Sequence, residues 1–239
     1  MDALRRDFLV DDLHAVASQV GVTGAILVEC ERTIDETLWL STIASGSDLI
    51  CGVVGWAPLT SSTIVSELER IACLTKVKAV RHPIHDEVDD QFVLREDFNH
   101  GIATLEQFGL KFDILILERH LPQTIQFVDR HPNQVFILDH IAKPRIRDRV
   151  LSPWKENLTE LARRQNVYCK LSGLVTEANW HTWSGEDLRP YMETALEAFT
   201  PKRVMFGSDW PLVTLASSYG RWSDTVGAWI EQLSPAERE

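Results

Sequence analysis

Ionisable side chains stand at the ends of several short apolar runs in this sequence. Asp209 closes the run 204–209, and Trp210 and Pro211 restrict the backbone directly after it. A carboxylate that stays ionised and is held rigidly can take a proton from a reacting water. The alternative for this residue is a helix cap or a loop turn, because aspartate commonly starts helices. We predict that Asp209 is catalytic.

His140 stands in a similar position. Asp139 and His140 close the run 135–140, ahead of Lys143 and Pro144. An imidazole at the end of a buried strand can bind a metal or hydrogen-bond a substrate oxygen, whereas the alternative is a core histidine whose nitrogens are satisfied by the protein. We predict that His140 is the second catalytic residue.

Arg81 and His82 close the run 77–82. The guanidinium could hold a carboxylate or a lactone carbonyl through two hydrogen bonds, or it could be a structural salt-bridge partner beside a capping histidine, and the sequence favours neither. The spacing His82-x-x-His85 is only a weak metal signal, because Pro83 disturbs a helix there.

The other polar groups near run ends are assigned structural roles. Lys170 has apolar neighbours, and we expect it to form a salt bridge. Ser172 is expected to bond nearby backbone, because neither G-x-S-x-G nor S-x-x-K surrounds it. Glu118 and His120 are expected to lie on a solvated loop.

Two tryptophans, Trp180 and Trp183, are expected to cover a pocket as an apolar lid, or else to pack a loop onto its rim. The chain has no P-loop, no dinucleotide fingerprint and no H-E-x-x-H motif. Several common nucleotide and metalloprotease functions are therefore excluded.

The composition is that of a globular protein, with 44% hydrophobic and 25% charged residues among 239. A net charge of -11 without a Lys/Arg-rich stripe disfavours nucleic-acid and membrane partners. The sequence has neither a membrane-length apolar stretch nor the apolar core of a signal peptide. The cysteines form no C-x-x-C pair, so we expect small buried hydrophobes in a reducing cytoplasm; they are Cys30, Cys51, Cys73 and Cys169.

Seven short runs rich in Val, Ile, Leu and Phe predict seven strands. They are apolar on both faces, as a parallel sheet covered by helices requires, and amphipathic stretches separate them. The sequence therefore predicts an α/β fold in a single domain, 1–239. The runs are 25–30, 50–56, 77–82, 112–117, 135–140, 167–172 and 204–209.

Eight helices are expected to alternate with these strands. Residues 7–21 precede the first strand and 223–233 follow the last, while 94–109 ends on Gly109, a natural stop. Two helix starts are marked by a serine, with Pro153 after Ser152 as the first helical residue and Ser184-x-x-Asp187 as a capping box. A β/α chain that begins with a helix lacks a strand, so we expect a first strand before Met1.

Four segments resemble one family and occur in its order. They are VKAVRH (77–82), VFILDHIAKP (135–144), VYCKLSGL (167–174) with TEANW (176–180), and FGSDWP (206–211). The chain thus resembles the TIM-barrel amidohydrolase-related hydrolases, a group that includes L-fuconolactonase-like and 2-pyrone-4,6-dicarboxylate lactonases. The resemblance implies a (β/α)8 TIM barrel whose first strand is missing from this chain. It also implies hydrolysis of a small carbohydrate-derived or aromatic lactone by activated water.

The resemblance assigns roles to the site residues. Asp209 would activate water and carry its proton, His140 would contact a metal or the substrate carbonyl, and Arg81 would hold the anionic or hydroxylated end of the substrate. Further substrate-binding residues would be His82, Trp210 and Trp180. One divalent metal, preferably zinc, is implied, with His140 and Asp209 as its ligands, although some relatives are thought to work without metal.

The chain departs from the family pattern in one respect. The family begins with a strand carrying His-x-His, which is absent from the eight histidines here. We therefore expect a chain truncated at both ends. Two other functions stay open: a zinc-type decarboxylase of the same superfamily, and a non-catalytic barrel that has lost its His-x-His strand. The expected partner is a small-molecule substrate, and a homo-oligomer is allowed.

Overall fold

The structure is a computed structural model that describes residues 2–238 and divides into two compact units. The strand-rich unit comprises Gly24–Leu138 and Arg164–Val167. The terminal unit comprises residues 2–23, 139–163 and 168–238. Within residues 2–238 no helix is both long enough and apolar enough to cross a membrane.

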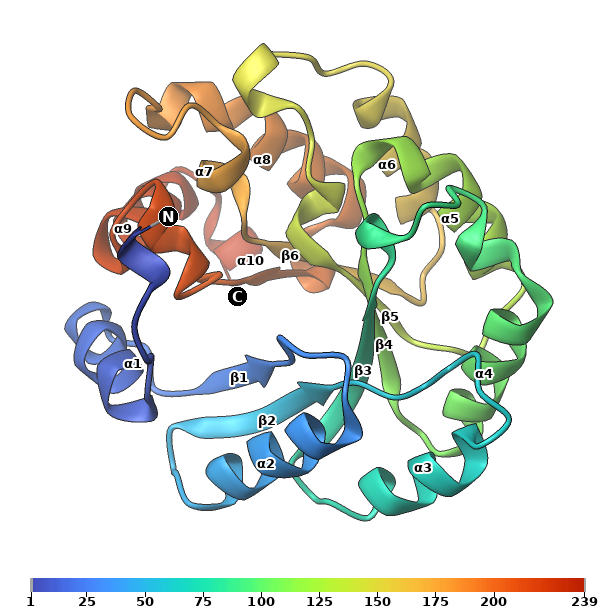
Figure 1. The fold of residues 1–239 in the computed structure, drawn as a ribbon. Coiled ribbons are helices and arrows are strands. Elements are labelled where there is room, and N and C mark those ends of the chain that lie inside the picture. The colour runs from blue at the N-terminus through green and yellow to red at the C-terminus, as the bar shows by residue number, and fades with distance from the viewer. Residues whose placement is uncertain (1, 239) are drawn as a thin grey trace. The chain divides into compact units, whose positions relative to one another are not determined.

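The strand-rich unit alternates parallel strands with helices (Figure 1). Each strand pairs in parallel with the next along the chain, and Arg81 is in register with Asp113. The strands are β1 (Ala25–Val28), β2 (Ile50–Gly55), β3 (Val77–Pro83), β4 (Lys111–Leu115) and β5 (Phe136–Leu138). The helices between them are α2 (Ile34–Ser45), α3 (Ile64–Ala72), α4 (Glu96–Gln107) and α5 (Leu121–Asp129).

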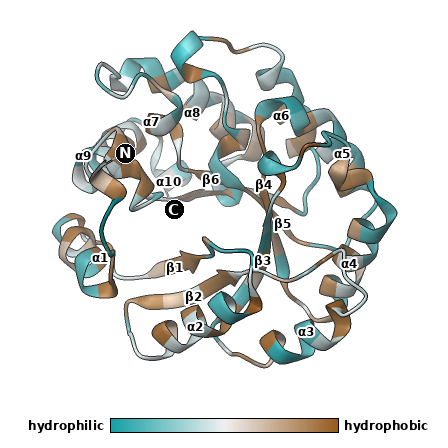
Figure 2. Ribbon diagram, viewed as in Figure 1, coloured by the Kyte–Doolittle hydropathy of each residue, from teal (hydrophilic) through white to brown (hydrophobic). Residues whose placement is uncertain are grey.

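Aromatic side chains fill the core of this unit between its helices and strands. Phe98 and Phe127 come from α4 and α5, and they meet Phe112 of β4 and Phe136 of β5; all four are fully buried. Burying each ring contributes about 1.5–3 kcal/mol. Figure 2 shows β1 and β2 largely in hydrophobic colours while the helices mix both kinds, as expected of helices with one solvent-facing side.

The terminal unit contains the other six α-helices of residues 2–238, the strand β7 (Val204–Phe206) and all of β6 (Val167–Leu171) but its first residue; β6 and β7 pair in parallel. Helix α8 packs on α6, where Tyr191 meets Trp154, and α9 packs on α1. The helices are α1 (Val10–Ala17), α6 (Trp154–Ala162), α7 (Leu174–Glu177), α8 (Gly185–Phe199), α9 (Tyr219–Ile230) and α10 (Pro235–Arg238).

All seven predicted strands are present, and six of them, all but β3, end one to three residues earlier than predicted. β5 stops at Leu138 and β7 at Phe206, so His140 and Asp209 lie in the turns beyond the strands rather than at strand ends. Both turns contain left-handed backbone, which a strand cannot continue through. The structure also has ten α-helices in residues 2–238 instead of eight, because α7 and α10, of four residues each, carry no recognisable periodicity.

Helix boundaries follow the predicted signals in two of three cases. The Ser184 amide donates to the Asp187 carboxylate at 3.0 Å, which confirms the capping box at α8. Gly109 has φ +69° just past the end of α4, as a C-terminal stop requires. Pro153, however, is the capping residue of α6 rather than its first helical residue.

The expected burial of the cysteines is wrong for three of the four. Cys169 is buried, whereas Cys30, Cys51 and Cys73 are exposed. Cys51 is the one exposed residue of β2, Cys30 follows the end of β1 and Cys73 caps α3. An apolar run therefore indicates a strand but does not determine the burial of each residue in or beside it.

Candidate active site

The terminal unit brings the two predicted catalytic side chains together. Nε2 of His140 lies 3.8 Å from Oδ1 of Asp209, with 11% and 14% of the two side chains exposed. Each residue has left-handed backbone, φ 52° at His140 and φ 54° at Asp209. Because residues with a Cβ rarely adopt this region, such strain is typical of functional turns. The structure thus places these two side chains close together, and their catalytic roles stay predictions.

His140 begins a run of four left-handed residues, from φ 52° at His140 to φ 49° at Lys143. Each such residue costs roughly 1–2 kcal/mol without glycine. The turn is held from several sides. The Lys143 amide donates to the His140 carbonyl, the Trp154 indole donates to the Ile141 carbonyl at 2.8 Å, and Lys143 pairs with Glu177 at 3.3 Å.

Ser172 holds the other side of the His140 ring. Its Oγ lies 2.8 Å from Nδ1 of His140, and the serine is 1% exposed. Ser172 was expected to bond nearby backbone, and that prediction is wrong, because the hydroxyl reaches the ring instead. The sequence shows only which residues lie next to Ser172 in the chain, whereas its hydrogen-bond partner is 32 residues away.

Two glycines make room for this contact. A Cβ on Gly173 would lie 2.8 Å from Cγ and Nδ1 of His140, and its φ is +69°. A Cβ on Gly207 would lie 2.7 Å from Cβ of Ser172. Any other residue at either position would displace His140 or Ser172, so the glycines are required by close approach.

The charge state of His140 is set by its surroundings. Burial lowers the pKa of His140, while the Asp209 and Asp139 carboxylates act in the opposite direction. A neutral imidazole is therefore favoured near neutral pH, with one nitrogen as donor and the other as acceptor. Asp139 itself, 1% exposed, pairs with Lys170 at 2.7 Å, which confirms the predicted salt bridge of Lys170.

The tryptophans near this pair differ in exposure. Trp210, next to Asp209, meets the ring of Phe8 edge-on at 5.2 Å. Trp180 is 40% exposed, and its indole donates to the Thr176 carbonyl. Trp183 is buried, with the Arg221 guanidinium over its ring at 3.7 Å. Trp183 thus packs its loop, whereas Trp180 presents an open apolar face.

Arg81 in the strand-rich unit is engaged by Glu29 at the end of β1. Nε of Arg81 donates to Oε1 of Glu29 at 2.7 Å and NH2 to the Glu29 carbonyl at 2.6 Å. Glu29 is 1% exposed, and burial raises the pKa of its carboxyl against the opposing effect of Arg81. Of the two alternatives for Arg81, the structure shows the salt bridge.

His82, the other predicted substrate-binding residue of this unit, stacks on Phe92 with ring centroids 5.0 Å apart. Its Nε2 lies 2.8 Å from Oε1 of Glu87, and burial lowers its pKa. His85 pairs separately with Asp86 at 3.1 Å. His82 and His85 therefore have different partners and do not form a common metal site, as the weakness of the His82-x-x-His85 signal suggested.

His120 is not on a solvated loop as predicted, because it is 1% exposed. Its Nδ1 accepts the Leu117 amide, and its Nε2 lies 2.9 Å from the Asp90 carboxylate. The ring is thus part of the loop's own hydrogen bonding. The charged residues next to His120 in the sequence suggested an exposed loop and gave no sign that the ring is buried.

The described donors do not fit a protein-bound catalytic metal by themselves. Zinc in catalytic sites usually takes three protein ligands. His140 and Asp209 supply two, and no group of three metal-binding side chains gathers anywhere in residues 2–238.

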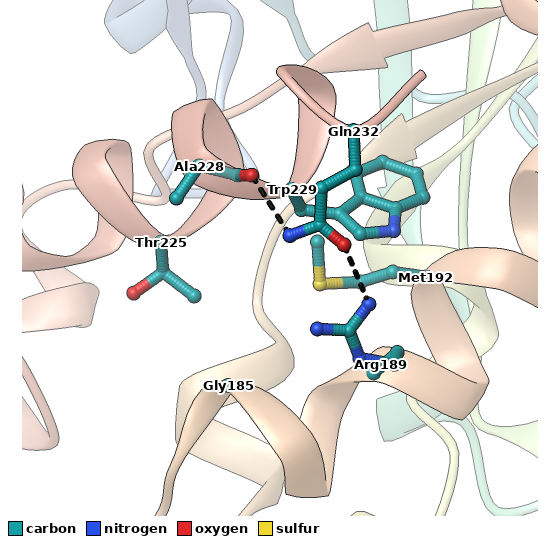
Figure 3. A pocket seen from close by; sticks show the side chains of 7 residues that line it. All are labelled: Gly185, Arg189, Met192, Thr225, Ala228, Trp229 and Gln232. Carbon is teal, nitrogen blue, oxygen red and sulfur yellow. Dashed lines mark hydrogen bonds between the residues drawn. The ribbon is translucent and has the colours of Figure 1, made fainter.

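A separate pocket of about 240 Å³ lies between α8 and α9 (Figure 3). Its polar groups already bond one another, since Arg189 donates to Gln232 at 2.9 Å and Gln232 donates to the Ala228 carbonyl. Arg189 is also paired with Glu186. This pocket contains none of the predicted site residues and no free charge for a ligand within its described lining.

Comparisons with known proteins now decide the family. A family model described as Amidohydrolase matches residues 2–239. The chain belongs to the amidohydrolase family. An L-fucono-1,5-lactonase of Burkholderia multivorans is 39% identical to it over 251 residues, covering 100% of this chain and 84% of the relative. A second L-fucono-1,5-lactonase, from Burkholderia ambifaria, is 34% identical and covers 97% of this chain and 79% of that relative.

Solved structures agree with the family. The crystal structure of an amidohydrolase from Burkholderia multivorans with bound zinc has a TM-score of 0.93 and 40% identity, covering 100% of this chain and 86% of that one. The predicted TIM-barrel α/β class is confirmed by this likeness. The amidohydrolase described here is thus a hydrolase, and the hypothesis of a non-catalytic barrel loses its support.

Proposed function

We propose that this amidohydrolase hydrolyses the lactone of a small sugar acid. The observation that carries the proposal is the Asp209–His140 pair. Oδ1 of Asp209 and Nε2 of His140 are 3.8 Å apart and both side chains are partly exposed, so each atom can bond to a substrate or a water. The two relatives named as L-fucono-1,5-lactonases support a carbohydrate lactone over an aromatic one.

Asp209 acts first as the general base. Its carboxylate accepts a proton from water while the water oxygen bonds to the lactone carbonyl carbon. The carbonyl oxygen becomes negative, and His140 stabilises it by donating a hydrogen bond from Nε2. Ionised Asp209 and neutral His140 are the forms that this step requires.

Ring opening reverses the proton flow. The tetrahedral centre re-forms its C=O bond and the ring C–O bond breaks. Asp209, now protonated, gives its proton to the departing alkoxide oxygen. The products are a hydroxy acid, which loses its proton to solvent near neutral pH, and an ionised Asp209 ready for another cycle.

The remaining predicted residues complete the proposal. Trp210 and Trp180 are assigned to the apolar ring face of the substrate. A substrate-binding role for Arg81 and His82, which are engaged by Glu29 and Glu87, stays a prediction. A crystal structure of a related amidohydrolase carries zinc, so activity is to be compared with and without added Zn²⁺. A cytoplasmic setting is supported by four free cysteines, three of them exposed. Self-association remains a prediction.

Decarboxylation receives less support. A 2,6-dihydroxybenzoate decarboxylase has a TM-score of 0.63 but only 14% identity, so it shares the fold alone. The reactions are also distinguishable, since lactone hydrolysis releases a proton whereas decarboxylation consumes one and releases carbon dioxide.

The test is a panel of sugar-acid and aromatic lactones, assayed by proton release with and without added Zn²⁺. Asp209→Asn should lower turnover by about a hundredfold or more, because the amide cannot accept the proton. Asp224→Asn, which changes an exposed carboxylate of α9, is the matched control and should keep wild-type turnover. Unchanged turnover in Asp209→Asn would reject the assignment.

A further inference from the structure

We propose that Ser172 is the positioning residue that makes His140 a hydrogen-bond donor at Nε2. The inference rests on the proposed function for the role of His140, but its structural part stands on the hydrogen bonds around the ring. Ser172 would not touch substrate and would act through His140 alone.

The hydroxyl of Ser172 has a single place to donate. Within residues 2–238, the only hydrogen-bond partner of its Oγ is Nδ1 of His140, at 2.8 Å. Ser172 is 1% exposed, so its hydroxyl cannot readily donate to solvent water instead. If Nδ1 were the donor instead, the hydroxyl hydrogen would be buried without an acceptor, which is unfavourable. Ser172 therefore donates, and Nδ1 accepts.

This arrangement fixes the proton of the neutral ring. When Nδ1 accepts, the one N–H of a neutral imidazole is on Nε2. Nε2 faces Asp209 at 3.8 Å, which is too long for a direct hydrogen bond. The N–H is thus free to donate to a substrate oxygen beside the pair, where the carbonyl of a lactone would develop negative charge.

Gly207 packs against Ser172, whose hydroxyl contacts His140. A Cβ at Gly207 would lie 2.7 Å from Cβ and 3.1 Å from Oγ of Ser172. Ser172 therefore has no freedom to move away from the ring on that side, and substitution of Gly207 displaces the hydroxyl without removing it. Gly207 and Ser172 should consequently share one phenotype.

The first experiment measures the tautomer directly. Histidine labelled with ¹⁵N is incorporated into the wild-type protein, and long-range ¹H–¹⁵N spectra are recorded near pH 8, with His140 assigned by its absence in His140→Asn. The expected result is a protonated Nε2 and an unprotonated Nδ1. A protonated Nδ1 overturns the proposal whether or not the protein hydrolyses lactones.

The second experiment measures catalysis. Ser172→Ala should lower kcat on the order of ten- to a hundredfold with a smaller change in KM, because the ring loses its orientation rather than a substrate contact. Gly207→Ala should lower kcat comparably, and Ser172→Thr, which keeps the hydroxyl, should recover part of the loss. Ser217→Ala is the control, since the buried Ser217 hydroxyl has no partner among the described residues.

The outcomes separate the two claims. An Nε2–H tautomer in a protein that opens no lactone would reject the proposed function and leave the positioning of His140 intact. Lactonase activity that is unchanged in Ser172→Ala would reject the positioning role and leave the proposed function intact.

Discussion

The two units each hold a carboxylate, but in opposite ways. In the strand-rich unit, Oε1 of Glu29 is in direct contact with Nε of Arg81 at 2.7 Å, and Glu29 is 1% exposed. In the terminal unit, Asp209 faces His140 across 3.8 Å and keeps 14% of its side chain exposed. In the closed pair the two side chains are committed to one another, whereas the open pair leaves the Asp209 carboxylate without a direct hydrogen bond to His140.

The comparison also extends to backbone strain. Glu29 directly follows β1 and Arg81 lies within β3, while His140 and Asp209 both have left-handed backbone. Strain persists only where surrounding contacts overdetermine it, as the Trp154, Ser172 and Lys143 contacts do around His140. The open pair is thus the one that requires strained backbone, and the strain serves to position its side chains.

Breaking the closed pair should have the largest effect on stability. Arg81→Met leaves the Glu29 carboxylate buried without its charged partner, and we expect a loss of about 3–5 kcal/mol in the free energy of unfolding. Chemical denaturation measures this loss. Arg70→Met, which breaks the more exposed Arg70–Glu67 pair of α3, is the control and should cost less than about 1 kcal/mol. Equal losses in both variants would contradict the distinction between a buried and an exposed pair.

Crowding the open pair should have an intermediate effect. Gly173→Ala puts a Cβ against the His140 ring and requires alanine at φ +69°. We expect a loss of about 1–2 kcal/mol from the backbone alone, together with a fall in kcat as the ring shifts. Gly220→Ala in α9, where nothing lies within 4 Å of the added Cβ, is the control for denaturation and turnover.

The smallest effect concerns pH. Burial lowers the pKa values of His82, His120, His131 and His140. The unfolded chain protonates its histidines near pH 6.5 while the folded chain resists, so this stability is fully present above about pH 6.5 and is lost as the pH falls below it.

Thermal unfolding at pH 7.5, 6.5 and 5.5 checks this sign. Tm should fall on acidification by about 2–4 °C for each kcal/mol lost. The raised pKa of Glu29 acts in the other direction, since its contribution is lost as the pH rises above about 4.5. A Tm that rises from pH 7.5 to 5.5 would show that the carboxyl, rather than the histidines, dominates.

Local sequence signals predicted much of the fold. Both-sided apolar runs identified seven strands, and Ser184 and Gly109 marked helix ends correctly. These features depend on side chains within a few residues of one another, so one sequence is enough to predict them. The four-residue helices α7 and α10 were missed because so short an element shows no period.

The sequence alone also named His140 and Asp209, because their residue types and positions after apolar runs restrict what they can do. Only the tertiary structure decided that His140 bonds Ser172, that Glu29 closes on Arg81 and that the turn at 140–143 is left-handed. Those facts join residues 32 and 52 positions apart, or depend on packing around the backbone. Contacts of that kind are set by how the chain folds back on itself, which local residue order does not encode.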